Sequence, residues 1–121
     1  MSLLSELKTI MGGLNIPCET GVFKGTAPSE YVVFVPLTDD LFCADDAPTD
    51  EVNTVRIVLY SKGNYLTTAK KICRQCVADE IVITARNYIT HEDDTGYHQY
   101  AIDVQKNYEW EETTNGTDRT S

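Results

Sequence analysis

The sequence predicts an α+β fold, with a mainly antiparallel sheet of four to five strands and two helices packed on one face. Two segments, residues 3–14 and 65–77, repeat apolar side chains at steps of three and four residues, which is the period of an amphipathic helix. Other segments alternate apolar and polar residues or are rich in β-branched and aromatic residues, as strands are. A turn sequence joins the last two of these segments, which indicates an antiparallel hairpin.

Both predicted helices have recognisable ends. Ser2 can cap the first turn of the helix at residues 3–14, and the glycines at positions 12 and 13 can end it. Asn64 can cap the helix at residues 65–77. One stripe of this second helix is expected to face the sheet, and it consists of Leu66, Ala69, Ile72, Cys73 and Cys76. The opposite side carries Lys70, Lys71, Arg74 and Gln75.

The predicted strands lie at residues 16–24, which is the weakest, and at residues 31–37, 52–61, 81–89 and 97–110. Because Pro36 has no N–H to donate, the second strand is expected to end there or to lie at an edge of the sheet. The strand at residues 52–61 has two partly apolar faces, so both faces are expected to be covered. The Asp-Asp-Thr-Gly sequence at residues 93–96 is the turn between the last two strands.

Residues 38–51 are predicted to form a long, irregular loop. The segment holds six acidic residues and no basic one, yet Leu41, Phe42 and Cys43 lie in its middle. Long loops are usually functional or disordered, and an apolar group on a polar loop is typical of an anchor for a partner. The alternative is that these three residues fold back into the core of their own domain.

The outer face of the strand at residues 52–61 carries more apolar surface than a solvated face needs, which favours a contact between subunits. Arg56 on this face is the candidate counter-charge for the aspartates of a neighbouring subunit. The candidate interaction residues are Leu41, Phe42, Asp45, Asp46, Arg56 and Tyr60.

The chain of 121 residues is long enough for one domain, predicted at residues 1–111, and the polar residues 112–121 are expected to be a flexible tail. Acidic residues outnumber basic ones 19 to 10, which gives a net charge of -9. This balance disfavours specific binding of nucleic acid, which needs clustered lysine and arginine. No apolar run is long enough for a membrane span, and no signal peptide is recognisable, so we expect a product that stays in the cytoplasm where it is made.

Cys73 and Cys76 have the spacing of a thiol redox or metal motif, but they lie late in the predicted helix, where the helix dipole does not favour a thiolate. Packing in the core is the favoured interpretation, and a small cytosolic metal- or thiol-dependent protein is the alternative. His91 and His98 flank a hairpin turn, where we expect them to be solvated. No phosphate-binding glycine loop, nucleophile elbow or zinc-protease motif occurs, so the sequence favours a protein that is not an enzyme and needs no cofactor.

The chain resembles the tail-terminator proteins of long-tailed siphophages and their prophages, also called tail-completion or tail-to-head joining proteins. The resemblance is strongest to the group from phages of Gram-positive hosts. It is carried by an amphipathic N-terminal helix, by the segments APSEYVVFVPL and DLFCADDAP, and by EVNTVRIVLYSKG followed by a short helix. It extends over about residues 1–110, and neither the cysteine pair nor the polar tail is part of it.

The resemblance implies an assembly protein without catalysis. Such proteins form a ring, commonly a hexamer, on the last ring of the tail tube at the head-proximal end of the tail. They bind the major tail tube protein, stop its polymerisation and present a surface to the head-completion or connector protein, while DNA passes through without specific binding. Another neck or minor tail component of the virion is the nearest alternative.

Overall fold

The computed structural model describes residues 2–45 and 47–110, and in these residues it has two helices and a five-stranded sheet. The elements follow one another as α1 (Leu3–Gly13), β1 (Cys18–Thr20), β2 (Glu30–Ala44), β3 (Ala47–Ser61), α2 (Tyr65–Ala78), β4 (Val82–His91) and β5 (His98–Glu109). The strand order is β1-β2-β3-β5-β4, in which only the pairing of β1 with β2 is parallel. The predicted α+β fold is therefore confirmed.

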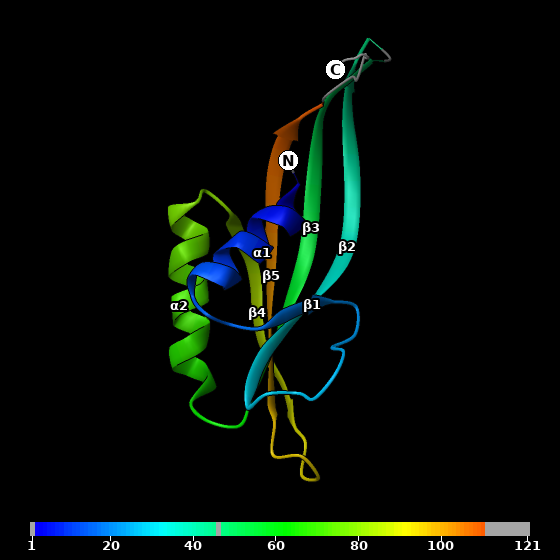
Figure 1. The fold of residues 1–121 in the computed structure, drawn as a ribbon. Coiled ribbons are helices and arrows are strands. Elements are labelled where there is room, and N and C mark those ends of the chain that lie inside the picture. Colours follow the sequence, from blue (N-terminus) through cyan, green and yellow to red (C-terminus); the bar gives the residue numbers. More distant parts are fainter. Residues whose placement is uncertain (1, 46, 111–121) are drawn as a thin grey trace.

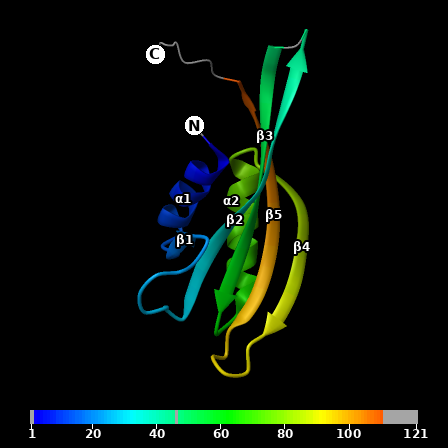
Figure 2. The same cartoon turned by 90° about the vertical axis from the view of Figure 1, so that its right-hand side faces the viewer.

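Both helices lie against the same face of the sheet, and the other face is turned toward the viewer in Figure 2 (Figures 1 and 2). The helices begin where the sequence indicates. Ser2 forms a capping box with Ser5, and the Asn64 side chain accepts a hydrogen bond from the backbone N–H of Thr67. A side-chain acceptor at this position satisfies a backbone donor that has no partner inside the helix.

The hydrophobic core lies between the two helices and the covered face of the sheet. Its largest fully buried side chains are Phe34, Leu3, Leu7, Met11, Ile57, Leu59, Ile72, Ile102, Val32, Val104 and Cys76. The strand members come from β2, β3 and β5, which are neighbours in the centre of the sheet. In α2 the predicted stripe is confirmed except at its first residue: Leu66 is 50% exposed, and Thr68 is buried instead.

Polar contacts also hold α1 against the sheet. Lys106 on β5 donates hydrogen bonds to the Glu6 carboxylate at 2.9 Å and to the backbone carbonyl of Asp79 at 2.9 Å, and the Tyr108 hydroxyl donates to the same carboxylate. Burial alone would raise the pKa of Glu6, but the hydrogen bonds from Tyr108 and Lys106 outweigh it, so this pKa is lowered. The Glu6 carboxylate is therefore held in its charged form.

The prediction of an irregular loop at residues 38–51 is wrong. β2 continues through Pro36 to Ala44, and β3 begins at Ala47, so the two strands form one long hairpin in which Ala44 pairs with Ala47. Pro36 is accommodated because β1 pairs only with residues 32–34 of β2, which leaves an edge beside Pro36, and because the register shifts directly after it. The weak strand expected at residues 16–24 is reduced to β1.

Candidate interaction surface

The outer part of the β2–β3 hairpin, residues 38–44 and 47–54, is called the arm here. It extends beyond the helices at one end of the molecule (Figure 1). At its base β5 pairs with β3, so the arm begins as three strands and continues to its tip as the two strands of the hairpin. The Thr49 hydroxyl donates a hydrogen bond to the backbone carbonyl of Phe42 at 3.1 Å, which ties the two strands together near the tip.

The arm exposes apolar side chains. Leu41 is 48% and Phe42 is 55% exposed, and because they are adjacent in a strand their side chains point to opposite faces. Phe42 pairs with Asp50, and Asp50 pairs with Glu109 on β5, so these three residues form a row on the face that the helices leave uncovered. Leu41 pairs with Glu51, which in turn pairs with Tyr108, on the face toward the helices.

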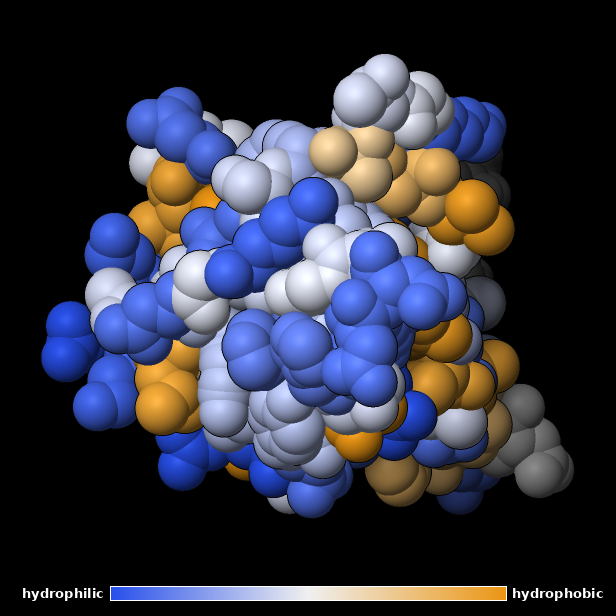
Figure 3. Space-filling view, turned by 90° about the horizontal axis from the view of Figure 1, so that it is seen from below, coloured by the Kyte–Doolittle hydropathy of each residue, from blue (hydrophilic) through white to orange (hydrophobic). Residues whose placement is uncertain are grey.

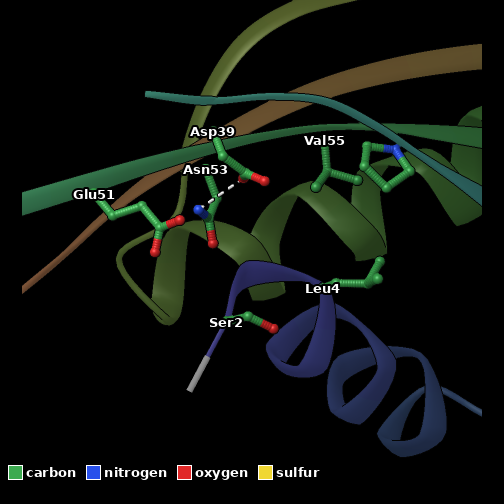
Figure 4. Close-up of a pocket in the computed structure, with 7 residues that line it drawn as sticks. Ser2, Leu4, Asp39, Glu51, Asn53 and Val55 are labelled. Carbon is green, nitrogen blue, oxygen red and sulfur yellow. Dashed lines mark hydrogen bonds between the residues drawn. The ribbon is translucent and has the colours of Figure 1, made fainter. Parts of the chain in front are cut away.

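A shallow pocket of about 240 Å³ lies where the arm meets the start of α1 (Figure 4). Leu4 of α1 and its N-cap Ser2 form one side, and Asp39, Glu51 and Asn53 form the other; Pro36 and Val55 complete the lining. The Asn53 side-chain amide donates to the Asp39 carboxylate at 2.9 Å, and its oxygen accepts from the backbone N–H of Leu3 at 3.2 Å. Asn53 therefore joins the base of the arm to the N-terminus of α1, where a negative charge such as that of Asp39 is favourable.

The structure separates the candidate residues into two groups. Leu41 and Phe42 lie on the arm, and Asp45 directly follows β2 with a positive φ of 52°, a conformation that aspartate tolerates. Asp46 lies outside the described residues, as does the polar tail expected at residues 112–121. Arg56 and Tyr60 lie farther down β3, on the same face as Phe42.

Arg56, the expected counter-charge for a neighbouring subunit, already has a partner within its own chain. Its guanidinium forms a two-point ion pair with the Asp103 carboxylate of β5, at 2.8 and 3.1 Å, within the same chain. This hydrogen bonding raises the pKa of Arg56. A contact of Arg56 with the aspartates of a neighbouring subunit would compete with this strong bidentate pair, and it stays a prediction.

Tyr60 belongs to an aromatic cluster at the end of β3 opposite the arm. Its ring stacks on Tyr31 with a centroid distance of 4.7 Å, and Phe23 and Tyr97 also contact the Tyr31 ring. Such contacts cover the sheet face that neither helix reaches. At this end the surface is mostly hydrophilic and its hydrophobic side chains form separate patches around the rim (Figure 3).

Sequence reasoning missed Asn53 and Asp50 of the arm, and Glu109 of β5, which the strand register places beside Asp50. The usable signal was the Ala-Asp-Asp-Ala sequence at residues 44–47, a possible two-residue hairpin turn. The low strand propensity of aspartate and proline on both sides concealed it.

Cys73 and Cys76 face the core, as the packing interpretation expects, with exposures of 9% and 0%. Burial, together with the neighbouring Cys73 and Asp79, raises the pKa of Cys76 to about 12. Burial also raises the pKa of Cys73. A thiolate is the form that binds metal or attacks a disulfide, so both shifts oppose such chemistry.

His91 and His98 lie on the paired ends of β4 and β5, with ring centroids 4.6 Å apart. The Tyr88 hydroxyl and His98 Nδ1 are 3.0 Å apart, and His91 Nδ1 lies 3.2 Å from the Asp93 carboxylate. Across residues 2–45 and 47–110, no three histidine, cysteine or acidic side chains are grouped so that they could hold a metal ion. In the same residues neither helix is long and apolar enough to cross a membrane.

No model of a known protein family matches this chain, and no curated protein sequence matches it either.

Exchanging Cys76 for serine is expected to lower the free energy of unfolding by about 1–3 kcal/mol, because a hydroxyl would be buried among apolar side chains. Cys43→Ser is the matched control, since Cys43 is exposed on the arm, and it should change stability by less than about 0.5 kcal/mol. Urea denaturation measures both effects. Zinc should leave the melting temperature of the unaltered chain unchanged; a rise of several degrees that Cys76→Ser removes would contradict the packing role.

Proposed function

We propose that the chain is a phage assembly protein of the tail-terminator class. It caps the tail tube of a long-tailed phage, ends polymerisation of the tube protein and forms the joint to the head connector. It acts as a ring of identical chains, with six as the expected number, at the head-proximal end of the tail. It is not an enzyme, and it needs no cofactor.

The observation that carries this proposal is the arm. A hairpin that leaves the core and exposes Leu41 and Phe42 has apolar surface whose burial becomes favourable only on contact with another molecule. A two-stranded hairpin is marginally stable by itself, so a partner also supplies packing that the tip lacks. These properties suit a protein that joins preformed rings.

The acidic character of the chain suits the same role. A net charge of -9 on each copy gives a ring a strongly negative field, which repels the phosphates of DNA and prevents the DNA from adhering during passage. The thiol-dependent alternative is weaker, because burial raises the pKa of Cys73 and of Cys76.

The test uses tails assembled in vitro from the tube protein encoded by the same genome. Added in excess, the chain is expected to stop the lengthening of tubes, and a gold-labelled chain should appear at one end of each tail by electron microscopy, the end that joins heads. Tubes that lengthen normally in its presence would overturn the proposal. Label at the opposite end or within the head would favour a different virion component.

A further inference from the structure

Basic residues are scattered over most of this acidic chain but gather on one face of α2. Lys70, Lys71 and Arg74 are exposed there, and they form no ion pair with any residue that the structure describes. Leu66 and Val77 lie before and after them on the same side of the helix, and they are 50% and 64% exposed. These five residues are called the basic helix face here.

The arm carries the complementary pattern. Asp50 and Glu109 stand in the same row as Phe42, and Asp40 lies two residues before Phe42 on the same face of β2. None of the three carboxylates forms an ion pair within residues 2–45 and 47–110. One surface therefore presents an aromatic ring among carboxylates, and the other presents cations between two aliphatic side chains.

The two surfaces also agree in spacing. Lys70 and Arg74 are one helical turn apart, which is about 6 Å along the axis. Asp50 and Glu109 lie on adjacent strands, which are separated by about 5 Å. A helix laid across the arm can therefore place Lys70 near Asp50 and Arg74 near Glu109, while Phe42 at the β2 end of the row contacts Leu66, one turn before Lys70.

A single chain cannot make this contact with itself. The tip of the arm and α2 are well separated in both Figure 1 and Figure 2. We propose that the arm of one copy docks on the basic helix face of the next copy, through Phe42, Asp40 and Asp50 with Glu109 of the adjacent β5 on one side, and Leu66, Lys70 and Arg74 on the other.

This contact joins two different surfaces, so it is head-to-tail, and repetition produces either a closed ring or an open filament. The inference rests on the proposed function only for the statement that the contact closes into a ring. It also explains why the cations of a strongly acidic chain are kept together on one surface: they offset the repulsion between copies at the place where the copies meet.

The test is a pair of charge reversals. The arm variant is Asp40→Lys with Asp50→Lys, and the helix variant is Lys70→Glu with Arg74→Glu. Each variant alone brings like charges together, so its self-association is expected to weaken by about tenfold or more relative to the unaltered chain. In an equimolar mixture of the two variants, the basic arm of one meets the acidic helix face of the other, and the acidic arm of the second meets the basic helix face of the first. Every junction again pairs opposite charges, so association should return. Sedimentation across a range of protein concentrations measures each step.

Lys8→Glu with Lys24→Glu is the matched control. It changes the net charge by the same amount as the helix variant, but at two exposed positions that lie outside both surfaces. It should associate like the unaltered chain, and urea denaturation should show that every variant is folded. The exposed thiol of Cys43 supplies a second measurement. A bis-maleimide should link it to a cysteine introduced by Thr67→Cys on α2 of another copy, and not to one introduced by Thr9→Cys on α1.

An unaltered chain that stays monomeric at every concentration, or a mixture that associates no better than its components, would overturn the inference. These failures are separable from failure of the proposed function. If the unaltered chain caps tubes, but mixing the two variants does not restore association and Cys43 does not crosslink to α2, the arm contact is wrong and the capping role stands. If the rescue succeeds and tubes lengthen without limit, the contact stands and the capping role fails.

Discussion

Replacing Phe34 by alanine is expected to lower the free energy of unfolding by about 3–5 kcal/mol. Phe34 is completely buried, and its strand partner Ile57 and the neighbouring Leu59 are buried with it under the two helices. Phe34 belongs to a core cluster with members from both helices and from β2, β3 and β5, so removal of the ring leaves a cavity that these elements cannot all move inward to fill.

Val35 supplies the matched control, because it is the next residue of β2, its side chain is on the opposite face, and it is 37% exposed. Val35→Ala is expected to cost less than about 1 kcal/mol. Urea denaturation with an unchanged slope compares the two. A domain of this size has a free energy of unfolding of only about 5–15 kcal/mol, so Phe34→Ala can unfold the chain. Phe34→Leu is expected to cost about 1–1.5 kcal/mol and supplies a folded variant in that case. Equal costs at positions 34 and 35 would contradict the position of the core.

The helices and the buried face of the sheet were predictable because their signals are local. A period near 3.6 residues defines the helix faces, capping side chains define their first turns, and alternation places Val55, Ile57 and Leu59 on one face of β3. Leu66 is the exception. In the first turn of α2, Tyr65 and Thr68 make the contacts with the sheet, to Tyr88, Tyr100 and Glu30, and Leu66 lies on the outer side.

The arm was not predictable from local signals, because its residues have low strand propensity. Asp39, Asp40, Asp50 and Pro48 favour turns and loops. What makes them a strand is continuation of a register that begins in the core and is supported at the base by β5, which lies about 50 residues farther along the chain. The pairing of Arg56 with Asp103 depends on the same distant strand.

Whether residues 38–51 form a flexible loop or paired strands changes the affinity expected of the candidate interaction surface. A flexible loop would lose conformational freedom on binding, at about 1 kcal/mol or more for each residue that becomes ordered. Strands that are already paired have lost most of that freedom during folding. The arm therefore presents Leu41 and Phe42 in fixed positions, and more of the free energy of their burial remains as affinity.

Phe42→Ala is expected to separate folding from assembly. With its side chain 55% exposed, Phe42 has little burial to lose, so the free energy of unfolding should change by less than about 1 kcal/mol. Contact with a partner should weaken by about 2 kcal/mol or more, which is about thirtyfold in a dissociation constant, if the ring fills a partner surface. The two measurements are urea denaturation and the amount of protein that stops the growth of tail tubes.

Leu41→Ala is the control that decides which face of the arm is used, since Leu41 is similarly exposed on the opposite face. If copies meet on the face of Phe42, Asp50 and Glu109, Phe42→Ala impairs both self-association and capping, and Leu41→Ala impairs self-association much less. If Leu41→Ala impairs self-association and capping and Phe42→Ala does not, the binding face is the one toward the pocket of Ser2, Asp39 and Asn53. A Phe42→Ala variant that loses several kcal/mol of stability and still stops tube growth at the normal amount would place Phe42 in the core and remove the basis for both proposals.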